Sequence, residues 1–178
     1  MMTEKVSFEK FLFRTAFCVM ACDGHIDNRE IDEIKQLVVT TSFFRDIDIE
    51  EELRRLLDAI HSDGKKIFVE FLDELNERDC DVVQELMILE IALRMIYVDE
   101  KLEKNEQHLM HLIRSKLNVA DEIIHQRFGA VDSLLGDKKL IQPLQVTEAD
   151  VPDVYGADGS DEEFRSLDVD WEHLKRSE

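Results

Sequence analysis

The sequence predicts an all-α protein with about seven helices, and three observations support this fold class. Two prolines and six glycines in 178 residues leave few helix breakers. Apolar residues recur at the i, i+3, i+4 spacing of amphipathic helices, and no segment alternates as a strand would. The same acidic interruption between two such helices also occurs twice, which indicates two related helix–loop–helix units.

The first unit begins with a helix expected from about Ser7 to Cys22, which ends at an acidic break, Asp23-Gly24-His25-Ile26. A second helix should start near Asp27. Asp27 stands three residues before Glu30, which is the spacing of an N-terminal capping box. The second helix is expected to bury one stripe, formed by Ile31, Ile34, Leu37 and Val38.

Three further helices are expected in the middle of the chain. The first should begin at Asp48 and stop at Ser62-Asp63-Gly64, a shorter helix follows, and Asp79 should cap a long one from Val82 to Tyr97. Their inward stripes are, in chain order, Leu53, Leu56, Leu57 and Ile60; then Ile67, Phe68, Phe71, Leu72 and Leu75; then Val83, Leu86, Met87, Glu90, Ile91, Met95 and Val98.

A second acidic break, over residues 99–103, precedes two final helices, predicted from Lys104 to Leu117 and from Ala120 to Phe128. From Gly129 onward the composition changes, because both prolines and four of the six glycines lie there. This change predicts a helical domain over residues 1–128 and an acidic, partly ordered extension over residues 129–178.

The extension ends with apolar residues at i, i+3, i+7 and i+10, a spacing that favours one short amphipathic helix. They include the only tryptophan of the chain: Phe164, Leu167, Trp171 and Leu174. Two roles remain open for this helix. It docks on the chain's own domain, or it is offered to the groove of a partner protein.

The duplication is clearest when the two acidic breaks are aligned. Three acids match, as Asp23/Asp99, Asp27/Glu103 and Glu30/Glu106. Apolar residues around them match too, as Ala16/Ala92, Val19/Met95, Ile26/Leu102 and Ile34/Met110. We therefore expect two pseudo-symmetric helix–loop–helix repeats that pack about a pseudo-twofold axis.

The matched acids are candidate metal ligands, because each turn should bring its three carboxylates together. Two carboxylates ~5 Å apart repel by about 3 kcal/mol at an effective dielectric constant of ~20. A converging set must therefore separate, take up protons, meet Arg or Lys, or bind a cation. Hard oxygen ligands favour Ca²⁺, Mg²⁺ or Mn²⁺. The candidate ligands are Asp23, Asp27, Glu30, Asp99, Glu103 and Glu106.

Two observations limit this metal hypothesis. The first copy reproduces positions five to twelve of an EF-hand loop, but positions one and three would be Val19 and Ala21, which carry no carboxylate, so a standard EF-hand is not predicted. A metal-free alternative also remains open. In that alternative Asp27 and Glu30 only cap the second helix, and Asp23 only accepts backbone N–H groups in the turn.

The doubled motif resembles the tellurite-resistance TerB-like family over roughly residues 7–128. An alanine and Asp-Gly after an apolar helix, followed by an acid and a Glu at this spacing, are typical of that family. Here Cys22 stands between Ala21 and Asp23, and the second copy has Glu100 where the first has Gly24. The resemblance implies a fold of about seven helices, a proposed metal-binding patch of acids on one face, and a module that works with other proteins in stress or defence.

Other potential sites are given ordinary structural roles. Cys18 and Cys22, near His25, are expected to be core thiols; His108 and His111 are expected at or near the surface; and Glu122-x-x-His125 lacks the second copy that di-iron bundles need. The chain contains no phosphate-binding, dinucleotide-binding or hydrolase motif. An enzyme is therefore unsupported, although paired carboxylates could in principle perform acid–base chemistry.

The net charge of −19 argues against nucleic-acid partners and favours cations or basic protein surfaces. Without a long apolar run, no membrane insertion is expected, and the three cysteines favour reduced thiols in the cytoplasm. The sequence thus predicts a TerB-like module that binds a divalent cation and acts through partner proteins. The alternative is a metal-free adaptor whose C-terminal extension docks a partner.

Overall fold

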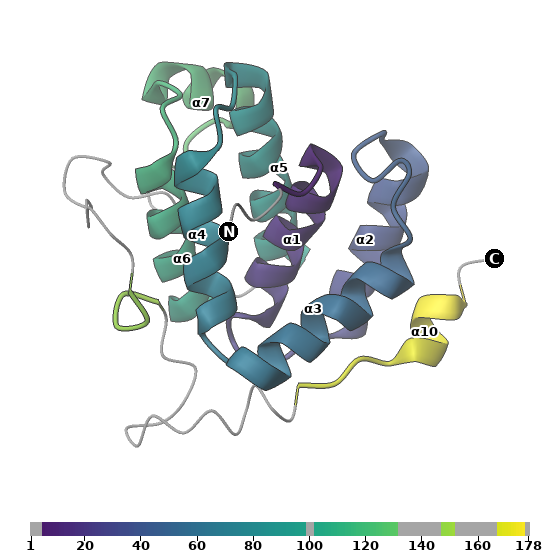
Figure 1. Cartoon of the computed structure of the whole chain (residues 1–178). Helices are drawn as coiled ribbons and strands as arrows, with labels where there is room; N and C mark the ends of the chain where they lie inside the picture. The colour runs from purple at the N-terminus through teal and green to yellow at the C-terminus, as the bar shows by residue number, and fades with distance from the viewer. Residues whose placement is uncertain (1–4, 99–101, 132–146, 152–166, 177–178) are drawn as a thin grey trace.

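The computed structural model describes residues 5–98, 102–131, 147–151 and 167–176 (Figure 1). These residues contain helices and no strand, so the predicted fold class is confirmed. The helices are α1 (Phe8–Ala21), α2 (Asn28–Thr40), α3 (Ile49–Asp63), α4 (Lys66–Glu77), α5 (Val82–Val98), α6 (Lys104–Lys116), α7 (Asp121–Phe128) and α10 (Trp171–Lys175). None of them is long and apolar enough to cross a membrane.

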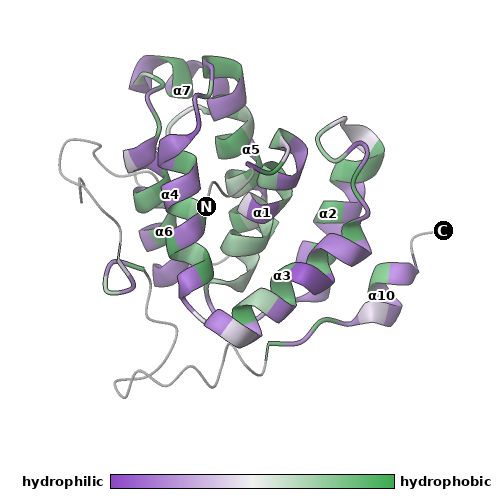
Figure 2. Ribbon diagram, viewed as in Figure 1, coloured by the Kyte–Doolittle hydropathy of each residue, from purple (hydrophilic) through white to green (hydrophobic). Residues whose placement is uncertain are grey.

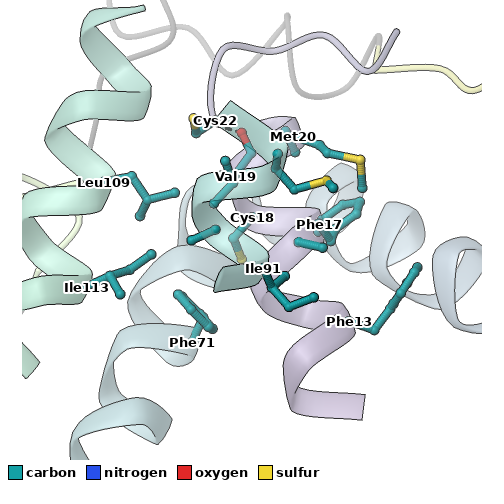
Figure 3. Packing of buried hydrophobic residues seen from close by; sticks show 14 of the residues in the cluster. Phe13, Phe17, Cys18, Val19, Met20, Cys22, Phe71, Ile91, Leu109 and Ile113 are labelled. Atoms are coloured by element: carbon teal, nitrogen blue, oxygen red, sulfur yellow. Dashed lines mark hydrogen bonds between the residues drawn. The ribbon is translucent and has the colours of Figure 1, made fainter. Parts of the chain in front are cut away.

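Helix α1 forms the centre of the molecule. It packs against α3, α4 and most extensively α5, and it is buried on nearly every side from Phe11 onward. Figure 3 shows its Phe17, Cys18 and Val19 surrounded by side chains from other helices, among them Ile91 of α5 and Leu109 of α6. A helix that is apolar on nearly all sides is stable only when other elements cover it, and α1 is therefore the helix around which the core packs.

Helices α3 and α4 confirm their predicted stripes, because all nine residues of the two stripes are buried. Figure 2 shows the amphipathic character of these helices, in which apolar and polar residues alternate around each ribbon. One aromatic contact ties α4 to the centre, since the rings of Phe11 and Phe71 stack with their centroids 5.3 Å apart. Such offset pairs add about 0.5–1.5 kcal/mol beyond the burial of their area.

Two predicted stripes are partly wrong. In α5, Val83 is 66% exposed, whereas Ile88 and Leu89, outside the predicted stripe, are fully buried. The first turn of α5 reaches solvent while its remainder is covered on several sides, so one stripe cannot describe it. In α2, Val38 is 42% exposed, and it lies beside Val39, which is 82% exposed.

The cap of α5 is also not the predicted one. Asp81, and not Asp79, begins this helix: its carboxylate accepts the Gln84 N–H at 2.8 Å, and the Gln84 side chain accepts the Asp81 N–H at 3.1 Å. This reciprocal pair has the spacing of a capping box. Asp79 lies two residues too early to reach the third residue of the helix.

A buried pair of charged residues holds the turn between α6 and α7. Glu85 of α5 is 4% exposed, and its carboxylate accepts the N–H groups of Asn118 and Val119, the latter at 2.6 Å. Arg114 of α6 is 2% exposed and donates to the Leu117 and Val119 carbonyls and to Asp121. The two side chains therefore satisfy backbone groups that neither helix can pair.

The C-terminal extension contacts the domain, but it forms less helix than predicted. Residues 167–170 are not helical, with Leu167 and Val169 buried and Asp168 and Asp170 exposed, and within the described part of the extension only Trp171–Lys175 forms a helix. The predicted helix spacing therefore fails before Trp171, because the segment there has the two-residue period of extended chain. Phe164 lies outside the described residues, and the predicted domain boundary at residue 128 stays a prediction.

Candidate functional site

The first acidic turn is built around Gly24. The Gly24 N–H donates to the Ala21 carbonyl at 2.9 Å, and Gly24 has a φ of 81°, a left-handed conformation that side-chain-bearing residues adopt only with strain. Asp23 closes the turn, since its Oδ1 accepts the His25 N–H at 2.9 Å. This is the backbone role that the metal-free alternative assigned to Asp23.

The next helix, α2, begins with the predicted capping box. Asp27 Oδ1 accepts the N–H groups of Arg29 and Glu30, at 2.8 and 3.1 Å, and Glu30 Oε2 accepts the Asp27 N–H at 3.0 Å. Arg29 also donates to Asp27 Oδ2 at 3.0 Å. Both oxygens of Asp27 are therefore engaged, and Glu30 is fixed with only 6% of its surface exposed.

The second turn uses the same chemistry at the start of α6. Glu106 Oε2 accepts the Glu103 N–H at 2.9 Å, as Glu30 does for Asp27, and Glu106 is 4% exposed. Glu103 is exposed, and glutamate is a weaker N-cap than aspartate. The matched acids at the two helix starts therefore play matched roles, and the first copy is the better formed.

The two turns meet at the end of α1. Asn105 of α6 donates from Nδ2 to the Cys22 carbonyl at 3.1 Å, which joins the second motif to the loop of the first. The sequence did not single out Asn105. Its position one residue before Glu106 was the only available signal, because contacts between the repeats cannot be read from spacing within one repeat.

The electrostatics of Glu30 indicate that the two motifs are close together. Burial raises the pKa of its carboxyl group to about 9, from an ordinary value of 4.5. The Asp27 N–H opposes this rise in pKa, and the negative charges of Asp23, Asp27 and Glu106 add to it. Glu30 is therefore protonated at neutral pH, because that removes a buried charge from a cluster of carboxylates.

The pKa values of the groups around Glu30 are shifted as well. Burial raises the pKa of Asp23, and the charge of Glu103 adds to the rise, against hydrogen bonding from His25. Burial alone would raise the pKa of Asp27, but hydrogen bonds from Glu30 and Arg29 bring this pKa below its ordinary value. The Cys22 thiol lies amid these carboxylates, and burial together with their charges raises its pKa.

The structure thus brings together five of the six predicted ligands: Asp23, Asp27, Glu30, Glu103 and Glu106. The sixth, Asp99, lies outside the described residues. Within the described parts of the chain, no three Asp, Glu, His or Cys side chains are arranged as a ready metal site. The donor set fits a hard cation in its chemistry, since all its ligands are carboxylates, but not as a preassembled geometry.

The other candidates take the structural roles expected of them. Cys18 and Cys22 are free thiols buried in the core, and burial raises the pKa of Cys18 to about 12, so it is an unreactive thiol. His25, by contrast, is exposed. Packing thus accounts for the two cysteines.

The capping role of Asp27 makes a separate prediction. Asp27→Ala should lower the free energy of unfolding by about 1 kcal/mol, because two N–H groups of the first turn lose their acceptor. Asp48→Ala is the matched control, since Asp48 caps α3 through the Glu51 N–H at 3.1 Å, away from the acidic turns. Urea unfolding in chelator should give similar losses for both variants. A loss several times larger for Asp27→Ala would show that it does more than cap.

No curated protein and no solved structure resembles the chain closely enough to count as a match. A family model described as "Tellurite resistance protein TerB" matches residues 12–127, which is more than half of the chain and includes both acidic turns. The chain therefore belongs to the TerB family.

Proposed function

We propose that this chain is a TerB-family helical module that binds a divalent cation at its paired acidic turns and acts through partner proteins in a stress or defence response. The feature that supports the cation is the cluster of carboxylates around the buried Glu30. A carboxyl group with a pKa of about 9, beside Asp23, Asp27 and Glu106, is a place where a cation can replace a proton.

Four described residues would hold the cation. The charges of Asp23, Glu30, Glu103 and Glu106 act across the two turns, whereas both carboxylate oxygens of Asp27 already have partners, in Arg29 and the helix start. Asp99, the counterpart of Asp23, completes the proposed set by its place in the sequence. Carboxylate donors alone favour Ca²⁺, Mg²⁺ or Mn²⁺, and the cation would supply charge neutralisation that lets both turns keep their acids ionised.

Melting with and without metal tests this proposal. Ca²⁺, Mg²⁺ or Mn²⁺ should raise the melting temperature in proportion to the logarithm of its concentration, since a cation at 100 times its Kd stabilises by about 2.7 kcal/mol. The shift should be larger at pH 8.5 than at pH 6, because the native state must release the Glu30 proton to bind metal. Differential scanning calorimetry against chelator at both pH values measures it.

Two variants separate this site from general surface binding. Asp23→Asn should reduce the metal-dependent shift, whereas Asp48→Asn, at the cap of α3, should keep it. The absence of any metal-dependent shift in the wild-type protein, at either pH, would overturn the cation proposal.

A second candidate is a metal-free adaptor, in which the acids only cap helices and the C-terminal extension carries the function. The observation that favours it is the complete use of Asp27 and the backbone role of Asp23. Under this candidate, metal leaves the melting temperature unchanged at both pH values. Partner binding then depends on the extension and not on chelator.

A further inference from the structure

Residues 167–176 lie against the two helices α2 and α3. Its helix, α10, lies beside α2 and α3 in Figure 1. Leu167 and Val169 are 3% and 5% exposed, and Leu174 lies over an apolar floor. That floor is formed by residues of α1, α2, α3 and the first acidic turn: Phe13, Met20, Ile26, Ile31, Ile34, Ile49 and Leu53.

Polar side chains of the domain contact the backbone of this segment. His61 Nε2 lies 2.7 Å from the Leu167 carbonyl oxygen, so that nitrogen carries the proton and donates. The Lys35 ammonium donates to the His173 carbonyl. A groove that binds a peptide often donates side-chain hydrogen bonds to peptide carbonyls that have no hydrogen-bond partner within the peptide itself.

Side chains of the segment are also held individually. The Arg54 guanidinium stacks over the Trp171 ring at 4.0 Å from its centroid, and His173 Nε2 lies 2.7 Å from Asp32 Oδ1. These contacts come from α3 and α2 respectively. The groove therefore has a specific contact for an aromatic residue and another for a hydrogen-bonding residue two positions later. These add to the burial of the apolar pair Leu167 and Val169.

The groove extends beyond the part that residues 167–176 cover. A cavity of about 1000 Å³ runs along α2 and the start of α3, with Leu174, Lys175 and Arg176 at its edge. Its walls include Val38, Val39 and Ile47, of which Val39 is 82% exposed. A ligand longer than this segment has an apolar surface to occupy.

Two observations mark the segment as a ligand of the domain and not as part of it. The family match ends at residue 127, so α2 and α3 belong to the TerB region and residues 167–176 do not. The helix of the segment spans five residues, far below the ~12–15 that an isolated helix needs for marginal stability. Its conformation therefore depends on the groove.

We propose that the groove between α2 and α3 is a peptide-binding site of the TerB domain, with residues 167–176 as a resident competitor. Its ligand in trans is a segment of a partner protein with the same chemistry: two alternating apolar residues, then a one-turn helix that starts with an aromatic residue. This inference rests on the proposed action through partner proteins and names the surface and the class of partner. It does not depend on the cation.

A partner must bind tightly enough to displace the resident segment. A tethered ligand acts at an effective concentration of the order of millimolar, so a free segment of equal intrinsic affinity competes poorly at micromolar concentration. A successful partner therefore binds more tightly, for example by also covering Val38 and Val39. The covered state is the default state of the chain.

The test uses the full chain in chelator and a fluorescent peptide with the sequence of residues 167–176. Leu167→Asp/Val169→Asp releases the resident segment, because it places charges at two buried positions. The peptide should bind this variant at least about tenfold more tightly than it binds the wild-type chain, as measured by fluorescence anisotropy. Equal binding to both chains, or no binding to a variant that keeps its helical circular dichroism, would overturn the proposal.

Two arginines supply a matched pair for specificity. The Arg54 and Arg127 side chains are 51% and 54% exposed, each pairs with a glutamate, and each stacks on an aromatic ring, but only the ring beneath Arg54, that of Trp171, belongs to residues 167–176. In the released background, Arg54→Glu should weaken peptide binding by about tenfold and Arg127→Glu should leave it unchanged. Equal effects of the two substitutions would show that the peptide binds by charge alone, against the proposal.

A second measurement needs no released variant. Trp171 is the only tryptophan, so its emission reports whether the resident segment is docked. Excess peptide carrying Phe in place of this Trp should shift the emission of the wild-type chain to the red as Trp171 enters water. An unchanged spectrum at peptide concentrations up to millimolar would contradict a displaceable segment. Dimers formed by segment exchange, detected by light scattering, would make a second copy the occupant and would also overturn the proposal.

Discussion

Glu85→Ala is expected to lower the free energy of unfolding by about 3 kcal/mol, one of the two largest effects predicted for a single substitution in this chain. The Glu85 carboxylate accepts the N–H groups of Asn118 and Val119 from a position that is only 4% exposed. Its removal leaves these donors without an acceptor, in a turn where Arg114 stays buried. Urea unfolding followed by far-UV circular dichroism measures the loss.

Glu52→Ala is the matched control for this experiment. Glu52 is also 4% exposed, but its partners are the side chains of Arg55 and Lys10, about half of whose surface is exposed. Those cations can return to water when the carboxylate is removed, so the loss should be within about 1 kcal/mol. Similar losses for the two variants would show that burial alone, and not the backbone hydrogen bonds of Glu85, determines the cost.

Glu30→Gln is expected to stabilise the protein increasingly as the pH rises above about 5. The native state holds a proton on Glu30 up to a pKa of about 9, whereas the unfolded chain releases it near the ordinary value of 4.5. The unfolded state therefore binds fewer protons between these values, and the free energy of unfolding falls as pH rises from about 4.5 to about 9. Glutamine keeps an oxygen for the Asp27 N–H and carries no proton to lose.

The difference in the free energy of unfolding between wild type and Glu30→Gln separates this effect from the titration of other groups. In chelator, the stabilisation by Glu30→Gln should be below about 1 kcal/mol at pH 5 and should reach up to about 3 kcal/mol at pH 7. Glu70→Gln, on the exposed face of α4, should follow the wild-type curve. Parallel stability curves for wild type and Glu30→Gln between pH 5 and pH 9 would contradict the raised pKa.

The acidic turns were largely predictable because their chemistry is local. The spacing of Asp27 and Glu30 is that of a capping box, and the structure contains one there. The doubled occurrence of the motif marked the matching acids at Glu103 and Glu106. The protonation of Glu30 was not predictable in this detail, because it depends on burial and on charges from both turns.

Predictions failed where packing between distant elements decides the outcome. The stripe of α3 was correct because one face of that helix meets the core, whereas α5 is covered on several sides and its stripe was partly wrong. Glu85 and Arg114 gave no signal as buried charges, since in the sequence each is one of many acids and bases. The exposure of Val38 depends on which other elements cover the end of α2, which periodicity cannot reveal.

The central position of α1 has a consequence for synthesis on the ribosome. This helix precedes the other described helices in the chain, and its main partner is α5, at Val82–Val98, so the part of its apolar surface that faces α5 stays uncovered until most of the domain has emerged. Pairing of such distant segments carries a chain-closure cost and slows folding relative to a bundle of sequence neighbours. A nascent chain stalled before residue 82 should therefore bind chaperones, and release should follow once α5 is available.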